Sequence, residues 1–133
     1  MGTFKSVSEV DAFYNMIMSN VLTGQGPHGT CTEYATANKA HNQYVQTSRR
    51  INGSKIICRT HRVALLQKLR LYELPATLEA SHLCHNKKCM NPDHLIAETH
   101  AANKSRDTCI YYRRMNSDPT FCTDDHEGSP RCL

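Results

Sequence analysis

The chain has 133 residues, of which 39% are hydrophobic and 7% aromatic, and it contains no tryptophan. A domain of this size buries a smaller share of its surface than a large one, so we expect stabilisation beyond a single apolar core. No apolar run approaches the length needed to cross a bilayer, which excludes a membrane-spanning protein and predicts a soluble one.

The formal net charge of +4 is unevenly distributed along the chain. Segment 34–72 contains no Asp or Glu, and its basic residues are Lys39, Arg49, Arg50, Lys55, Arg59, Arg62, Lys68 and Arg70. Such a one-sided segment creates a positive field suited to a polyanion such as a nucleic acid. The alternative is a basic face that is merely solvated.

The first predicted element is an amphipathic helix over residues 6–22. Its apolar residues recur at three- and four-residue spacings, with Ser6 and Glu9 in capping-box register and Gly24 as a stop signal. The apolar face needs a partner, which is either the body of the domain or a second subunit. The next segment, TGQGPHGT, is typical of a loop.

Residues 31–60 are predicted to form β structure. A short strand, CTEYA, precedes two longer runs, QYVQTSR and KIICR, and Asn52-Gly53 between these runs is a strong signal for a hairpin turn. Alternate side chains of a hairpin face the same way, so this hairpin can present a basic face on one side.

A second helix is predicted over residues 61–72, where apolar residues recur at helical spacing before Pro75. A short strand over 77–82 then leads into the loop CHNKKCMNPD.

The last predicted elements are an extended segment at 94–98 and a helix over 99–107. Thr99 is placed to cap this helix, which carries Asn103. Beyond residue 110 the composition is polar, and little there is expected to hold itself folded.

The seven cysteines require a separate explanation. Their odd number, and the lack of a compact hydrophobic run at the N-terminus, disfavour a secreted disulfide framework. Zinc ligation, or free thiols in a reducing compartment, are the uses that remain.

The metal-ligating residues form two sets. Cys84 and Cys89, followed by His94, have spacings that can converge on one tetrahedral zinc ion. The fourth ligand must come from elsewhere in the chain, and Cys31 and Cys58 are the thiols available upstream. The second set is Cys109, Cys122, His126 and Cys132. Two such sites would supply folding free energy directly, whereas the alternative for each cysteine is a buried, apolar-like thiol.

The stretch ASHLCHNKKCMNPDHLIAETHAANKSRD (80–107) closely resembles the signature of the His-Cys box homing endonucleases, and more loosely that of the zinc-loop HNH nucleases. Weaker similarity links CTEYA and INGSKIICRTHRVALL to the strand, hairpin and helix that precede the motif in both groups. The resemblance implies an α+β class: a small zinc-stabilised ββα-metal nuclease fold with an antiparallel β-sheet and few helices.

The resemblance also implies roles by position. His82 matches the general base of the family, and Asn103 matches its ligand for a catalytic Mg²⁺. The family uses an Arg on a strand to contact the scissile phosphate, and both Arg59 and Lys55 qualify for that role.

The zinc ligands follow from the same resemblance. For the first zinc they are Cys84, Cys89 and His94, and Cys31 in GTCTEY is a better match than Cys58 for the fourth. The second zinc site of the family begins at the position of Cys109. The other ligands here would be Cys122, His126 and Cys132, after a gap longer than the family has.

The chemistry of phosphodiester hydrolysis agrees with these roles. A neutral His can take a proton from water, and an Asn amide oxygen leaves most of the Mg²⁺ coordination sphere for phosphate oxygens and waters. Because protein ligands fill all four positions of each zinc site, both zinc ions are expected to be structural. His85 and His100 are expected to be bystanders.

The sequence therefore predicts a single endonuclease domain over 1–133. Its segments are a helix and loop (1–30), a DNA-binding hairpin and helix (31–75), the ββα-metal active site (76–109) and a zinc-bound tail (110–133).

The expected activity is cleavage of both strands of a specific DNA site, by an intracellular homodimer that is nuclear in a eukaryotic host. The residues expected to contact DNA are Arg49, Arg50, Lys55, Arg59, Gln46 and Asn52. The alternatives are a sequence-tolerant HNH nuclease or nickase, and a catalytically inactive, zinc-dependent DNA-binding module.

Overall fold

The computed structural model describes residues 3–26, 29–35, 43–116, 121–122 and 126–133. Lys39 of the basic segment lies outside these residues. The elements in chain order are α1 (Val7–Met18), β1 (Val21–Gln25), β2 (Cys31–Tyr34), β3 (Gln46–Ile51), β4 (Ser54–Arg59), α2 (Thr60–Leu69), β5 (Glu79–His82), the 3₁₀ helix η1 (Pro92–His94), β6 (Leu95–Glu98) and α3 (His100–Asn116).

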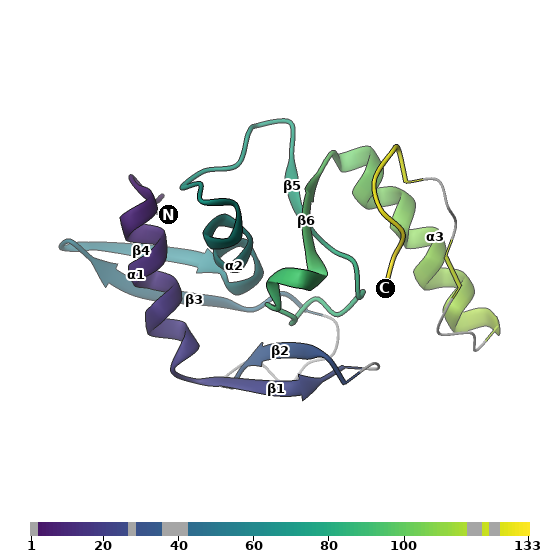
Figure 1. Cartoon of the computed structure of the whole chain (residues 1–133), viewed down its shortest axis with the longest axis horizontal. Helices are drawn as coiled ribbons and strands as arrows, with labels where there is room; N and C mark the ends of the chain where they lie inside the picture. The colour runs from purple at the N-terminus through teal and green to yellow at the C-terminus, as the bar shows by residue number, and fades with distance from the viewer. Residues whose placement is uncertain (1–2, 27–28, 36–42, 117–120, 123–125) are drawn as a thin grey trace.

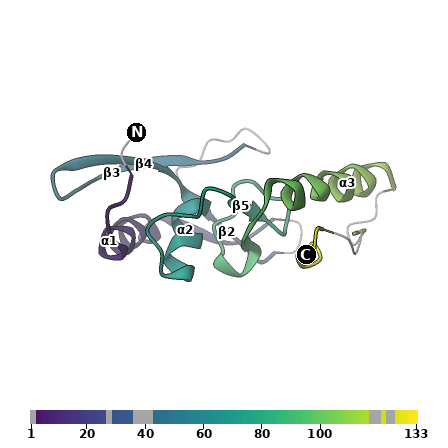
Figure 2. The same cartoon turned by 90° about the horizontal axis from the view of Figure 1, so that it is seen from above.

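The strands of the described residues form three separate two-stranded antiparallel sheets, β1–β2, β3–β4 and β5–β6, rather than one sheet (Figure 1). Helix α2 lies at the centre and contacts α1, β4, β5 and β6. Figure 2 shows the long β3–β4 hairpin along one side of the molecule, over α1 and α2, with α3 at the far end. The predicted α+β class, with short antiparallel sheets and few helices, is confirmed.

The apolar face of α1 is buried within the chain. Val10, Phe13 and Ile17 are each 0% exposed, and α1 packs on α2 and β3. The partner of this helix is therefore the body of the domain, and its apolar face is not available to a second subunit.

The N-terminal prediction was right about the start of α1 and wrong about its end. The Ser6 hydroxyl accepts from the Glu9 N–H at 3.2 Å, as a capping residue should. The helix ends at Met18, however, and residues 21–25 form strand β1. The reason is that residues 21–25 pair with the neighbouring strand β2, and this pairing is not indicated by the helical spacing of apolar residues.

The β3–β4 hairpin follows the sequence closely. Asn52 and Gly53 have φ angles of 51° and 82°, as a two-residue turn with left-handed backbone requires. The pairing sets Gln46 opposite Arg59, and Arg50 opposite Lys55.

Helix α3 is longer than predicted. Thr99 caps it, because its hydroxyl accepts from the Ala102 N–H at 3.2 Å, but the helix runs on to residue 116. Its last turns contact the tail: Arg113 Nε donates to the Phe121 carbonyl at 2.6 Å, and the Tyr112 and Phe121 rings lie 5.0 Å apart. This support comes from outside the helix, so its own polar sequence does not indicate it.

We expect Phe13→Ala to destabilise the fold by about 3–5 kcal/mol, because a fully buried ring would leave a cavity against Phe4. Urea unfolding at fixed zinc concentration measures this. Met16→Ala on the same helix is the control, since that side chain is 43% exposed and its loss should change the midpoint little. Equal midpoints for the two variants would contradict the packing described for α1.

Candidate active site and metal centres

The first metal cluster joins a loop to a distant strand. Cys31 begins β2, whereas Cys84, Cys89 and His94 lie in and after the loop that follows β5, and all four side chains are buried. The backbone holds the two parts together, because the Met90 N–H donates to the Thr32 carbonyl at 2.7 Å. Cys58 lies in β4 and does not belong to the cluster.

The spacing of the ligand atoms fits a tetrahedral zinc ion. Ideal Zn–S and Zn–N bonds set tetrahedron edges of about 3.8 Å between two sulfurs and about 3.6 Å between sulfur and nitrogen. Cys31 Sγ lies 3.7 Å from Cys84 Sγ and 3.5 Å from His94 Nδ1, and Cys89 Sγ lies 3.4 Å from His94 Nδ1. The cluster therefore has both the donor set and the dimensions of a structural zinc site.

Two neighbouring residues, Thr30 and Gly26, support the geometry of this cluster. The Thr30 hydroxyl lies 3.2 Å from His94 Nε2 and can accept the ring proton there, while Nδ1 faces the thiols of Cys31 and Cys89. Gly26 allows the close approach of the β1–β2 connection, since a Cβ at that position would lie 2.8 Å from Cys31 Sγ.

Three thiols this close cannot all ionise without a compensating positive charge. Hydrogen bonds from Cys84 and Cys89 lower the pKa of Cys31 to about 2, and the hydrogen bond to Cys31 raises the pKa of both partners. A divalent metal removes this conflict, because it binds all three sulfurs as thiolates.

The second cluster gathers the tail around α3. It contains Cys109, Cys122, His126 and Cys132, and His126 Nε2 lies 3.7, 3.2 and 3.6 Å from the three sulfurs in that order. The Ser105 hydroxyl donates to the Ala102 carbonyl at 2.6 Å, and its oxygen lies 2.8 Å from His126 Nδ1. The proton of His126 therefore sits on Nδ1, which leaves Nε2 to bind a metal.

A buried ion pair joins the second cluster to strand β6. Arg106 on α3 donates to both Glu98 oxygens at 2.8 Å, and its Nη1 lies 3.3 Å from Cys132 Sγ. Burial alone would raise the pKa of Glu98, but the hydrogen bonds and charge of Arg106 lower it. Both groups stay charged, so β6, α3 and the tail are joined at one point.

The end of β5 places His82 beside the first cluster. Its side chain is 7% exposed, and its Nε2 donates to the carbonyl of the zinc-cluster residue Cys89 at 2.9 Å. Nδ1 therefore carries the lone pair. Burial is the main reason that the pKa of His82 is lowered to about 4, so the ring is neutral at pH 7 and can accept a proton.

Asn103 lies on α3, across from β5. Its Oδ1 accepts from the Ser81 hydroxyl at 2.8 Å, and its Nδ2 donates to Glu79 Oε1 at 2.6 Å. These two contacts fix which end of the amide is oxygen. Sequence reasoning missed Glu79 and Ser81, and the only signal for them was their two-residue spacing on one predicted strand.

His82 and Asn103 line the same cavity of about 250 Å³. His85 and His100, expected to be bystanders, also line it. His100 is exposed and contacts Glu79 at 3.3 Å, whereas His85 Nε2 is buried with no partner among the described residues.

The register of the β3–β4 hairpin separates its basic residues onto two faces. Gln46, Arg50, Lys55 and Arg59 share one face and are exposed. Arg49 lies on the other face, where its Nη2 donates to the Tyr34 hydroxyl at 2.7 Å. Asn52 is exposed at the turn, and its Nδ2 donates to a Glu9 oxygen at 3.1 Å.

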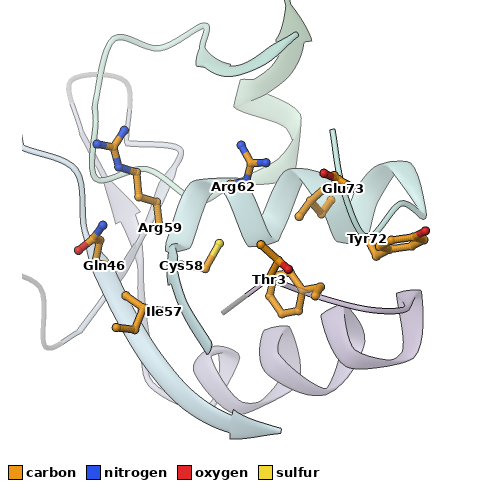
Figure 3. Close-up of a pocket in the computed structure, with 10 residues that line it drawn as sticks. Thr3, Gln46, Ile57, Cys58, Arg59, Arg62, Tyr72 and Glu73 are labelled. Atoms are coloured by element: carbon orange, nitrogen blue, oxygen red, sulfur yellow. The ribbon is translucent and has the colours of Figure 1, made fainter. Parts of the chain in front are cut away.

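Arg59 connects the β3–β4 hairpin to the cavity that His82 and Asn103 line. Its guanidinium carbon lies 4.3 Å from the ring centre of Tyr44, which lines that cavity. Arg59 also lines a separate pocket of about 380 Å³ between β4 and α2, together with Cys58, Arg62 and Tyr72 (Figure 3). Burial raises the pKa of the Cys58 thiol to about 11, so it remains protonated there.

A comparison with known families matches residues 28–133 to the zinc-binding loop region of homing endonuclease. The chain belongs to this family. The match covers both clusters and the His82–Asn103 cavity, and it confirms the resemblance seen in residues 80–107. A search of curated proteins finds no match.

The family membership and the two Cys₃His clusters together support two structural zinc ions per chain. Among the described residues, no helix is both long and apolar enough to cross a membrane.

We expect Cys89→Ser to lower the bound zinc from two ions per chain to one, because a hydroxyl replaces a thiolate in a closed four-ligand site. Cys122→Ser should do the same for the second cluster. Metal analysis of the purified protein measures the ratio, and Cys58→Ser, outside both clusters, should keep two ions. One zinc per chain in the wild type would contradict the second site.

Proposed function

We propose that this member of the family is a Mg²⁺-dependent, site-specific double-strand DNA endonuclease of the homing type. The main support is the position of Cys89, which contributes its sulfur to the zinc cluster and accepts a hydrogen bond from His82 at its carbonyl. His82 and Asn103 line the same cavity. A DNA-binding module needs the zinc cluster alone. It does not need a neutral, oriented imidazole and an amide oxygen in the same cavity.

The residues of the cavity can divide the hydrolysis between them. His82 Nδ1 takes a proton from the attacking water, because Nε2 is already committed to the Cys89 carbonyl. Asn103 Oδ1 has a second lone pair beyond its bond from Ser81, and we propose it as the Mg²⁺ ligand. When bound, Mg²⁺ supplies positive charge at the scissile phosphate and the leaving oxygen.

Lys87, Lys104 and Arg106 line this cavity, and Arg59 approaches it through Tyr44. Arg59 lies on one strand of the hairpin, and Lys87 Nζ lies 5.2 Å from the same Tyr44 ring that Arg59 covers. We propose Arg59 as the contact to the scissile phosphate. The other option, Lys55, pairs with Arg50 near the turn, at the opposite end of β4.

The exposed hairpin face is proposed to lie along the DNA. Arg50, Lys55 and Arg59 would neutralise phosphates, and Gln46 would read base edges. Arg49 and Asn52 are held by Tyr34 and Glu9 within the chain, so they are proposed to support this face rather than lead the contact.

A homodimer is part of the proposal, because each chain carries one His82–Asn103 pair and a double-strand cut needs two. In this arrangement segment 31–75 binds DNA, segment 76–109 cleaves it, and segments 1–30 and 110–133 support the other two.

His82→Ala should lower the cleavage rate by about 100-fold or more, because it removes the group that activates water. The assay incubates plasmid with protein, with and without Mg²⁺, alongside a DNA-binding measurement that should not change. Tyr111→Ala is the control, since this side chain is 57% exposed on α3 and lies outside the cavity. Unchanged cleavage by His82→Ala would rule out this base.

The same plasmid assay separates the alternatives. A linear product from one rare site supports the homing type, whereas a ladder of cuts or a nicked circle supports the sequence-tolerant nuclease or nickase. A plasmid left intact by the wild type would support the inactive DNA-binding module.

Replacing Arg50 and Lys55 by Ala should weaken DNA binding and reduce the slope of log affinity against log salt by about 1 for each lost phosphate contact. Arg70→Ala removes another exposed cation, which pairs with Asp11 at 2.9 Å, away from the hairpin. That control should leave the salt slope unchanged. Equal slopes for the double variant and the wild type would place the DNA elsewhere.

A further inference from the structure

A second buried imidazole lies against the proposed base. His61, in the first turn of α2, is 3% exposed, and its ring centre lies 4.6 Å from that of His82 at an interplanar angle of 32°. The ring of Tyr44 also stacks on His61, at 5.0 Å and 19°. Tyr44 also lies 6.0 Å from His82, so three rings form one packed group.

This position is unfavourable for a histidine that serves stability alone. His61 Nδ1 is buried and has no hydrogen-bond partner among the described residues. A buried polar atom without a partner costs about 1–3 kcal/mol, which an apolar ring of similar shape would avoid. Burial, followed by the nearby charges, lowers the pKa of His61 to about 2, so the ring is neutral and adds no charge beside His82.

His61 also links helix α2 to the strand that carries the base. Its ring faces the backbone of Ala80, two residues before His82 on β5. One side chain from α2 therefore lies against both β5 and one face of the His82 ring. The same group reaches the hairpin, because Arg59 covers the Tyr44 ring.

We propose that His61 is a positioning residue that holds the His82 imidazole with Nε2 on the Cys89 carbonyl and Nδ1 free for water. The inference rests on the proposed function of His82. It adds a ring contact to an imidazole that the hydrogen bond at Nε2 and the ring of Tyr44 also hold. A ring held on one face and at one nitrogen has a single favourable orientation, which is what a general base requires.

The first test compares His61→Phe and His61→Ala in the zinc-loaded protein. Phe keeps the ring contact, so its kcat should stay close to the wild-type value. Ala removes the ring contact, so its kcat should fall by about 100-fold while the KM for DNA and the two zinc ions are retained. Leu69→Ala, an exposed change on the same helix, controls for disturbance of α2 and should behave as the wild type.

The outcomes of this test are distinct. Wild-type kcat in His61→Ala overturns the proposal. Equal losses in Phe and Ala also overturn it, since the ring contact would then not be the cause. A parallel loss of zinc or of DNA affinity in His61→Ala would show a structural role and would overturn it as well.

A second test does not depend on cleavage. Long-range ¹⁵N–¹H NMR correlations of the His82 ring report which nitrogen carries the proton in the zinc-loaded protein without DNA. The wild type and His61→Phe should show the Nε2–H form alone, and His61→Ala should show a mixture of both forms. An unchanged Nε2–H pattern in His61→Ala would overturn the proposal. This spectrum does not require cleavage. A failure of the nuclease function would instead appear in the plasmid assay, where the wild type would leave the plasmid intact.

Discussion

The candidate site depends on one residue that contacts two groups. Cys89 directs its sulfur into the first metal cluster and its carbonyl at His82, so the same short loop is anchored by the cluster and holds the proposed base. The anchor crosses the fold, because Cys31 reaches the cluster from β2 and the Met90 N–H bonds back to that strand. A metal bound here orients the proposed base through one peptide group, without touching it.

The second cluster extends this constraint to the C-terminal end. The tail has little apolar sequence, yet His126 is fully buried, and Arg106 joins the cluster to Glu98 at the end of β6. The ion pair is favourable in this setting because both of its partners make charge-assisted hydrogen bonds. In a chain with a modest core, two metal sites and one buried ion pair replace the apolar area that a larger domain would use.

The basic hairpin surface reaches the proposed base where strand β4 joins helix α2. There Arg59 leaves the exposed face of β4 and covers Tyr44, whose ring stacks on His61 and lies near His82. A surface suited to a polyanion is thereby connected to a neutral, oriented imidazole through the ring of Tyr44. This contiguity favours the endonuclease proposal over a binding module, since binding alone would not require the basic surface to end at this cavity.

The sequence by itself determined the hairpin turn at Asn52-Gly53 and the set of Cys84, Cys89 and His94, because these depend on residue type at short, fixed spacings. Its resemblance to the family supplied the α+β class and supported the second metal-ligating set. The sequence left Cys31 and Cys58 as alternatives on spacing alone. It missed β1 and the last turns of α3, since each is stabilised by a neighbouring segment, β2 and the tail at Phe121, that the periodicity of the element itself does not indicate. Only the tertiary structure decided that Arg49 faces inward, that Glu79 and Ser81 orient Asn103, and that His61 packs on His82. Local sequence fixes which atoms can donate, accept or ligate, and packing fixes which of them meet.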